Sequence, residues 1–302
     1  MPADQINQAL KIIQENPSEF VVILGPTCTG KTALSLVLAN HFQVPIINAD
    51  SRLIFQEMDI GTAKPTLDEL NIIKHFLINI KKPNETYSAG EFQQDFDKIA
   101  SDLISNQSHT LKAIIVGGTG LYIKSALDNL NIPRISPNSS FREELGALDL
   151  ESLQKLLNEL DASAKNLIDM KNKIRIIRAI EIIKVSGKKL SDNRKLNPSE
   201  RYKATYIGLN YSDREFLYSL INKRVVQMIE AGLVDETQQL IDIYGATQTL
   251  KSTIGYREII SYLNQEINLE ESIYLIQKNT RNYAKRQITW FKSNPKTNWI
   301  YK

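Results

Sequence analysis

The eight residues Gly25-Pro-Thr-Cys-Thr-Gly-Lys-Thr32 constrain this 302-residue chain more than any other segment. They match the pattern G-x-x-x-x-G-K-[ST], follow the short apolar run Phe20–Leu24 and precede a helical apolar pattern over residues 32–42. Glycines at these positions let the backbone curl, so that successive N–H groups and the start of a helix face an anion. Lys31 adds a full positive charge, and the Thr32 hydroxyl can ligate Mg²⁺ held on phosphates. The segment therefore predicts a loop that binds a diphosphate or a triphosphate. The predicted phosphate ligands are Gly25, Pro26, Thr27, Cys28, Thr29, Gly30, Lys31 and Thr32.

Short apolar segments alternate with helical segments along the first half of the chain. Val44–Asp50 and Leu111–Val116 are predicted to be buried strands like Phe20–Leu24, and Ala89–Asn106 is predicted to be a helix. This alternation is typical of right-handed βαβ units. We therefore predict an α/β fold with a P-loop NTPase-like parallel sheet flanked by helices.

The character of the sequence changes after Leu130. Residues 131–140 are rich in Pro, Asn and Ser, which predicts a linker, and residues 141–187 have a helical pattern throughout that closes at Gly187. Strand-like alternation returns at Tyr202–Leu209. Further helices are predicted over residues 213–231, 234–244, 255–263 and 269–293. We expect a core of residues 1–130 and 201–302, interrupted by an all-helical insertion domain of residues 131–200.

Positive charge is concentrated in two segments of a chain whose net charge is only +3. Residues 171–195 contain nine Lys or Arg against Glu181 and Asp192, and residues 278–302 contain seven Lys or Arg and no acid. Each segment has a net charge of +7, so the rest of the chain carries −11. Either segment alone could be a solvated helix face. Together, with aromatic residues in the second, they favour a nucleic-acid partner.

Composition excludes several other classes of protein. No apolar run reaches the roughly 20 residues that a membrane-spanning helix needs, and the N-terminus lacks the apolar core of a signal peptide. The single cysteine, Cys28, excludes an internal disulfide and a cysteine-rich zinc site. Within the phosphate loop, Cys28 could be a thiol of lowered pKa, although we expect a small side chain that faces away. We expect a cytoplasmic enzyme.

The end of the third predicted strand argues against an ordinary nucleotide hydrolase. It continues as Ile115-Val116-Gly117-Gly118, where such an enzyme would place an aspartate that holds Mg²⁺. Asp50 is the only acid at a predicted strand end near the loop. It could orient a hydroxyl group in a small-molecule kinase whose lid carries the arginines of residues 171–195. From the residues alone, a kinase and a transferase both remain open.

Several segments together resemble the bacterial tRNA dimethylallyltransferases, also called isopentenyl-diphosphate:tRNA transferases. Beyond the loop, these segments are Asn48-Ala-Asp-Ser51, Met58-Asp-Ile-Gly-Thr-Ala-Lys-Pro65, Tyr87-Ser-Ala-Gly-Glu-Phe92, Val116-Gly-Gly-Thr-Gly-Leu-Tyr122, Arg178-Ala-Ile-Glu181, Arg224–Leu233, Ile254-Gly-Tyr-Arg257 and Lys285-Arg-Gln-Ile-Thr-Trp290. They occur in order over nearly the whole chain, and Met58–Pro65 and Lys285–Trp290 are the most specific when added to the loop.

The resemblance implies a reaction. A dimethylallyl group would move from dimethylallyl diphosphate to N6 of adenosine 37 in tRNAs that read codons starting with U, with release of pyrophosphate. We expect a monomeric, Mg²⁺-dependent enzyme whose partner is the tRNA anticodon stem-loop. A P-loop small-molecule kinase and a non-catalytic RNA-binding protein with the same fold are the alternatives.

The resemblance also implies roles for residues around the donor and the acceptor. Arg224 matches a family arginine that contacts the diphosphate, although on its helix it could also form a surface ion pair. Asp50 matches the carboxylate that accepts a proton from the adenine amine, although its position also suits a helix N-cap. Thr119 matches a threonine beside the reacting groups, although its glycine neighbours also suit a turn. Asp50 and Thr119 are thus the expected catalytic residues.

The target adenosine has to leave the anticodon-loop stack, at a cost of a few kcal/mol, and cationic surfaces that bind phosphates would offset this cost. The resemblance implies tRNA contacts in the segment after the second strand, in the insertion, in a turn near residue 255 and in the last helix. These expected contacts are Asp50, Ser51, Arg52, Leu53, Arg142, Ile174, Arg175, Arg178, Gly255, Tyr256, Arg257, Arg281, Lys285, Arg286 and Gln287.

Overall fold

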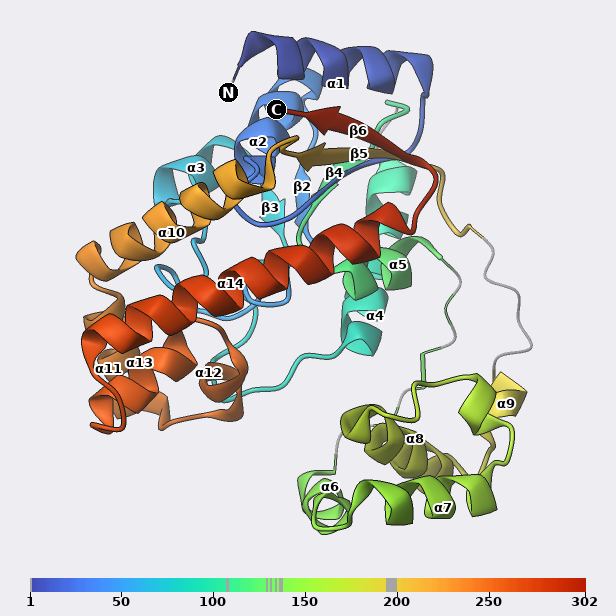
Figure 1. The fold of residues 1–302 in the computed structure, drawn as a ribbon. Coiled ribbons are helices and arrows are strands. Elements are labelled where there is room, and N and C mark those ends of the chain that lie inside the picture. Colours follow the sequence, from blue (N-terminus) through green and yellow to red (C-terminus); the bar gives the residue numbers. More distant parts are fainter. Residues whose placement is uncertain are drawn as a thin grey trace. The chain divides into compact units, whose positions relative to one another are not determined.

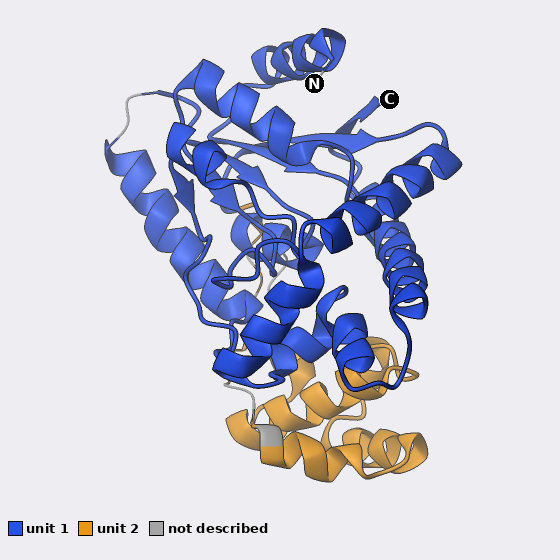
Figure 2. Ribbon diagram, turned by 90° about the vertical axis from the view of Figure 1, so that its left-hand side faces the viewer, with its two compact units in different colours: residues 1–127, 201–302 blue, residues 128–200 orange. Residues whose placement is uncertain are grey.

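The computed structural model describes the whole chain except Met1, Gln107, Ser108, Asn129, Asn131, Arg134, Ser136, Pro137 and residues 194–199. Arg194 and Lys195 of the first basic segment, and part of the predicted linker, therefore lie outside the described residues. The chain forms two compact units (Figure 2). The first unit combines residues 1–127 and 201–302, and the second consists of residues 128–200.

Six parallel strands form the sheet of the first unit, in the order β3-β2-β4-β1-β5-β6 (Figure 1). The strands are β1 Phe20–Leu24, β2 Ile46–Asn48, β3 His75–Phe76, β4 Ala113–Val116, β5 Ala204–Asn210 and β6 Thr297–Tyr301. This arrangement confirms the predicted α/β class and its parallel sheet. The two short outer strands β3 and β6 were not predicted. β3 has only two residues and β6 has an alternating pattern at the end of the chain, so neither contains a clear apolar run.

Both faces of the sheet are buried, which explains why its strands are continuous apolar runs. In β1, Phe20, Val22 and Leu24 point into one core cluster, whereas Val21 and Ile23 point into the other. Side chains alternate across a strand, so an uninterrupted run supplies both faces at once. A strand with one polar face could not occupy this central position.

Helices cover both faces of the sheet (Figure 1). One face packs against α1 Ala3–Glu15 and α2 Lys31–Phe42. On the other face, α4 Ala89–Asn106 packs against β1 and α5 Gly120–Leu127 packs beside α4. The same core cluster continues through α14 Leu269–Lys292, α10 Arg214–Glu230, α11 Leu233–Tyr244 and α13 Tyr256–Leu263, which pack on one another. The short helices α3 Leu67–Ile72 and α12 Gln248–Ser252 complete this unit. The long helix α14 runs across the face opposite α1 and brings residues near the chain end to the carboxyl edge of the sheet.

The second unit is helical, but the predicted continuous pattern over residues 141–187 is wrong. The segment forms α6 Ser139–Gly146, α7 Leu150–Leu160, a 3₁₀ turn Ala164–Asn166 and α8 Lys173–Ser186, followed by the short α9 Leu190–Asn193. Asp149 begins α7 by accepting a hydrogen bond from the Ser152 backbone N–H. Gly187 ends α8 with φ +66°, as predicted. Breaks between the helices let their apolar faces meet in one small core instead of lying along one rod.

Candidate active site

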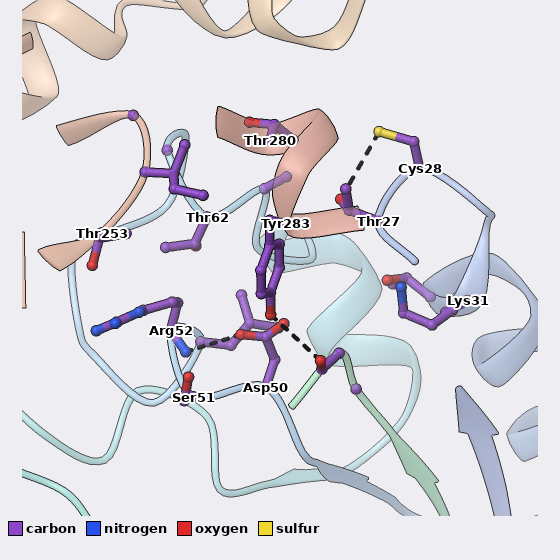
Figure 3. A pocket seen from close by; sticks show the side chains of 18 of the residues that line it. Thr27, Cys28, Lys31, Asp50, Ser51, Arg52, Thr62, Thr253, Thr280 and Tyr283 are labelled. Carbon is purple, nitrogen blue, oxygen red and sulfur yellow. Dashed lines mark hydrogen bonds between the residues drawn. The ribbon is translucent and has the colours of Figure 1, made fainter. Parts of the chain in front are cut away.

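Three loops meet where the adjacent strands β2, β4 and β1 end. The phosphate loop follows β1, Asp50 follows β2, and Gly117–Thr119 follow β4. The carboxyl edge of a parallel sheet is the usual place for a ligand site in such folds. A cavity of about 440 Å³ opens at this edge, and residues of α10, α13 and α14 line its other sides (Figure 3).

The phosphate loop is closely packed against the sheet. Gly25 has φ +140°, and a Cβ atom there would collide with the Leu209 carbonyl oxygen, so only glycine fits. The Thr29 hydroxyl and the Lys31 ammonium group donate to the Pro26 carbonyl, at 2.9 and 2.8 Å. Five of the predicted phosphate ligands line the cavity: Thr27, Cys28, Gly30, Lys31 and Thr32. The other three, Gly25, Pro26 and Thr29, are not among the lining residues.

Lys31 and Arg224 make this side of the cavity strongly positive. Burial lowers the pKa of Lys31 to about 8; Asp50 raises it in part, and nearby Arg224 lowers it further. The Arg224 guanidinium on α10 donates to the Thr27 hydroxyl at 3.2 Å and lies 3.6 Å from the Cys28 sulfur. Arg224 thus lines the cavity beside the loop. Cys28 lines it as well, instead of facing away as expected.

Asp50 is held in place by its neighbours and does not cap a helix. The Asn48 side chain accepts from the Asp50 N–H at 2.9 Å and donates to the Asp50 and Leu77 carbonyls at 3.0 and 2.7 Å. The Asp50 carboxylate accepts from the Arg52 N–H at 2.9 Å, within a turn that does not continue as a helix. Sequence reasoning missed this role of Asn48, although Asn48 begins one of the motifs that carry the family resemblance.

Thr119 is partly exposed and adjoins residues that line the cavity. Its hydroxyl accepts from the Ser51 N–H at 3.0 Å and donates to the Ser51 hydroxyl at 3.3 Å. Ser51 lines the cavity, whereas Thr119 is not among the lining residues. The structure therefore places Thr119 as a support for the Asp50–Ser51 turn.

Two side chains of α14 reach the same edge of the sheet. The buried Gln287 side chain accepts from the Thr27 N–H at 2.9 Å and donates to the Gly118 carbonyl at 3.0 Å. Tyr283 lies one turn earlier, donates weakly to the Gly118 carbonyl at 3.4 Å and points toward Asp50 (Figure 3). Burial raises the pKa of Tyr283 well above its ordinary value, so the phenol stays neutral. Sequence reasoning missed Tyr283, although its spacing of four residues from Gln287 puts both on one helix face.

The expected tRNA contacts in the first unit fall into two groups. Those that line the cavity are Asp50, Ser51, Arg52, Leu53, Gly255, Arg257, Arg286 and Gln287. Lys285 is exposed and places its ammonium group over the Tyr218 ring at 5.7 Å. Arg281 donates to the Asn222 side chain at 2.6 Å. Two expected tRNA contacts need correction. Tyr256 is fully buried, and both polar atoms of the Gln287 side chain are bonded within the protein, so neither side chain is available to tRNA.

In the second unit, two of the expected tRNA contacts belong to an internal ion-pair cluster. Arg142 and Arg178 both pair with Glu181, whose side chain is fully buried. Burial by itself would raise the pKa of Glu181, but hydrogen bonds from Arg142, the Asn138 backbone and Arg178 lower it to about 2. The cluster thus joins α6 to α8. By contrast, Ile174 is 80% exposed and Arg175 is exposed, so these two are accessible to a partner.

The described part of the chain contains neither a preformed metal cluster nor a membrane-spanning helix. Among its residues, no three His, Cys, Asp or Glu side chains come close enough to hold a metal ion. None of its helices is both long and apolar enough to cross a membrane.

Comparison with known proteins gives consistent matches over most of the chain. The family model described as IPP transferase matches residues 53–294. A tRNA dimethylallyltransferase of Gloeothece citriformis is 41% identical over 281 residues, which cover 93% of this chain and 90% of the relative. The crystal structure of the full-length tRNA isopentenylpyrophosphate transferase from Bacillus halodurans matches with a TM-score of 0.68 and 35% identity, over 94% and 89% of the two chains. A structure described as a eukaryotic dimethylallyltransferase acting on tRNA matches with a TM-score of 0.79 and 25% identity, over 93% and 73%.

Proposed function

The chain belongs to the IPP transferase family, and from this premise we propose that it is a tRNA dimethylallyltransferase. It transfers the dimethylallyl group of dimethylallyl diphosphate to N6 of adenosine 37 in tRNAs that read codons starting with U. The observation that carries the proposal is the convergence of a cationic phosphate loop and Asp50 on one cavity. The loop suits a diphosphate leaving group, and the carboxylate suits an amine that loses a proton.

The donor end of the cavity favours charge development on the leaving group. Lys31, Arg224 and the lining residues Thr27, Cys28, Gly30 and Thr32 of the loop border the place where a diphosphate would sit. As the C–O bond breaks, its electron pair leaves with the diphosphate, and fixed positive groups stabilise that charge. Thr32 lines the cavity next to Lys31, and its hydroxyl oxygen is a suitable ligand for Mg²⁺. A bound Mg²⁺ would supply further neutralisation of the diphosphate.

The acceptor end suits an adenine amine. The N6 nitrogen forms the new bond to the first carbon of the dimethylallyl group, and one N6 proton passes to the Asp50 carboxylate. The Asn48 side chain fixes the Asp50 backbone, and the Arg52 N–H donates to the carboxylate and orients it. The phenol of Tyr283 points toward Asp50, and the Arg52 guanidinium extends away from Asp50 along the same cavity (Figure 3). Their flat groups are suited to stacking on an extruded base.

The tRNA anticodon stem-loop is the proposed acceptor partner. Exposed cations and cavity-lining residues that remain available to it are Arg52, Leu53, Arg175, Gly255, Lys285 and Arg286, together with the exposed Ile174. Arg257 also lines the cavity, but its guanidinium pairs with the buried Glu258. We further propose that the protein acts as a monomer in the cytoplasm.

One incubation separates this function from its alternatives. The protein is mixed with Mg²⁺, dimethylallyl diphosphate and unmodified tRNA, and prenylated adenosine is measured after nuclease digestion. Asp50→Ala should lower transfer by roughly 100-fold or more while tRNA affinity stays near that of the wild type. Asp4→Ala, at an exposed acid of α1, is the control and should transfer normally. ATP turnover without prenylation would instead identify a small-molecule kinase, and tRNA binding without either reaction would identify a non-catalytic binding protein.

A further inference from the structure

Glu236, in the first turn of α11, has a carboxylate with four hydrogen-bond donors around it. The backbone N–H groups of Asp59, Ile60 and Gly61 donate to it at 3.1, 2.8 and 3.0 Å, and the Tyr256 hydroxyl donates at 2.6 Å. Hydrogen bonds to an ionised acceptor are the strong ones, and several at once leave the carboxylate one orientation. Three successive N–H groups of one loop are thereby fixed to a helix 175 to 177 residues away in the chain.

Tyr256 of α13 packs against the same loop. A Cβ atom on Gly61 would lie 2.5 Å from the Tyr256 ring, so the ring rests directly on the glycine backbone. Tyr256 is fully buried, and its hydroxyl shares the Glu236 oxygen that also accepts from Gly61. The backbone at Gly61 is therefore held by a hydrogen bond and by close packing at one point.

Lys64 anchors the other end of this loop. Its ammonium group pairs with the Asp59 carboxylate at 2.6 Å and donates to the Phe55 carbonyl at 2.8 Å and the Asn79 side chain at 2.6 Å. Its side chain is only 3% exposed. The residues between the Glu236 contacts and Lys64 cannot shift without breaking hydrogen bonds to a charged carboxylate or ammonium group.

The anchored segment forms a wall of the active-site cavity. Gly61, Thr62, Ala63 and Pro65 line the cavity, as do the apolar side chains of Ile221, Val225, Met228, Ile254 and Ile276. Arg224 and Met228 are four residues apart on α10 and face the same way. An apolar group attached to a diphosphate held by Arg224 would therefore extend along this wall.

We propose that Glu236 is a positioning residue for the prenyl donor, which fixes the wall of residues 61–65 and thereby limits the length of the prenyl chain that the cavity accepts. The inference rests on the proposed transfer from dimethylallyl diphosphate. Glu236 touches neither the donor nor the reacting atoms and acts only through the loop backbone.

The test is Glu236→Gln in the full-length protein, with dimethylallyl and geranyl diphosphates as donors. Glutamine keeps the volume but turns an amide donor toward the loop N–H groups. KM for dimethylallyl diphosphate should rise roughly 10-fold, and the kcat/KM ratio of the geranyl to the dimethylallyl donor should rise by a similar factor. KM for tRNA should stay unchanged, a result that general destabilisation would not produce.

Two further variants complete the design. Glu230→Gln, the same change at an exposed site at the end of α10, should leave both donor parameters at wild-type values. Tyr256→Phe removes one of the four donors and should shift the donor ratio in the same direction by a smaller factor, even if Glu236→Gln does not fold. Wild-type donor selectivity in Tyr256→Phe and Glu236→Gln, or equal losses for both donors and tRNA, would overturn the inference. Absence of transfer in the wild-type protein would instead overturn the proposed function.

Discussion

Lys31 shows how one residue can combine two demands of the site. Its ammonium group is buried so that it can face an anion, and that burial lowers its pKa to about 8. A diphosphate close to the ammonium group would favour the charged form again. Ligand binding above pH 8 must therefore be coupled to the uptake of a proton by Lys31.

This coupling can be measured by titration calorimetry with dimethylallyl diphosphate in buffers of different ionisation enthalpy. A group with a pKa of about 8 is roughly 90% neutral at pH 9 and roughly 10% neutral at pH 7. Binding should accordingly take up close to one proton per molecule at pH 9 and far less at pH 7, and affinity should fall as the pH rises above 8. Lys31→Arg, which stays charged, should bind without this uptake. Equal uptake by both proteins would assign the proton to another group.

At the scale of elements, the Arg142–Glu181–Arg178 cluster explains how α6 is tied to α8. Glu181 is fully buried and takes hydrogen bonds from two arginines and the Asn138 backbone. A buried carboxylate with these partners is stabilising only while it is charged. The folded pKa of about 2 lies below the ordinary value of 4.5, so its stabilisation is complete above about pH 4.5 and is lost as the pH falls toward 2.

Glu181→Gln should therefore destabilise the second unit by about 2 to 3 kcal/mol at pH 7, because it leaves two arginines without their counter-ion. Hydrogen exchange of the α6 and α8 amides measures this destabilisation, which should shrink as the pH falls below 4.5. Glu159→Gln, at an exposed position of α7, is the matched control and should change exchange little. Unchanged protection of α6 and α8 in Glu181→Gln would show that the cluster does not hold these helices together.

At the scale of the whole molecule, RNA binding depends more on where the positive charges lie than on the net charge. The two basic segments lie on different compact units, at α8 and at α14. Within each segment some cations are used internally, as at Arg178 and Arg281, whereas Arg175, Lys285 and Arg286 are exposed. Only exposed cations can release counterions from RNA phosphates on binding.

The salt dependence of tRNA affinity tests this distinction between exposed cations and cations that are bonded within the protein. Arg175→Ala and the double variant Lys285→Ala/Arg286→Ala should each weaken binding and reduce the slope of log Kd against log salt by about 1 for every phosphate that is no longer neutralised. Gln287→Ala is the control on α14, because its side chain is buried against the phosphate loop, and should leave the slope unchanged. A reduced slope for Gln287→Ala, or an unchanged slope for the variants of the exposed cations, would contradict this division of roles.

The sequence by itself determined the features that depend on neighbours in the chain. The phosphate loop, the β1 strand and the α4 helix follow from local glycine placement and from apolar spacing, and Asp50 follows from its place after a buried strand. The resemblance of ordered motifs added the reaction. These signals are local, since backbone conformation and the periodicity of burial are set within a few residues.

Only the tertiary structure decided which side chains face the cavity, the solvent or the core. Gln287 and Thr27 are 260 residues apart, and Arg142 and Glu181 are 39 apart, so no local pattern reveals that they bind each other. A lysine or arginine on a helix has the same sequence signature whether it contacts RNA or neutralises a buried carboxylate. The difference lies in the partner that folding brings within hydrogen-bond distance. A buried charged group needs such a partner, because burial without one costs free energy.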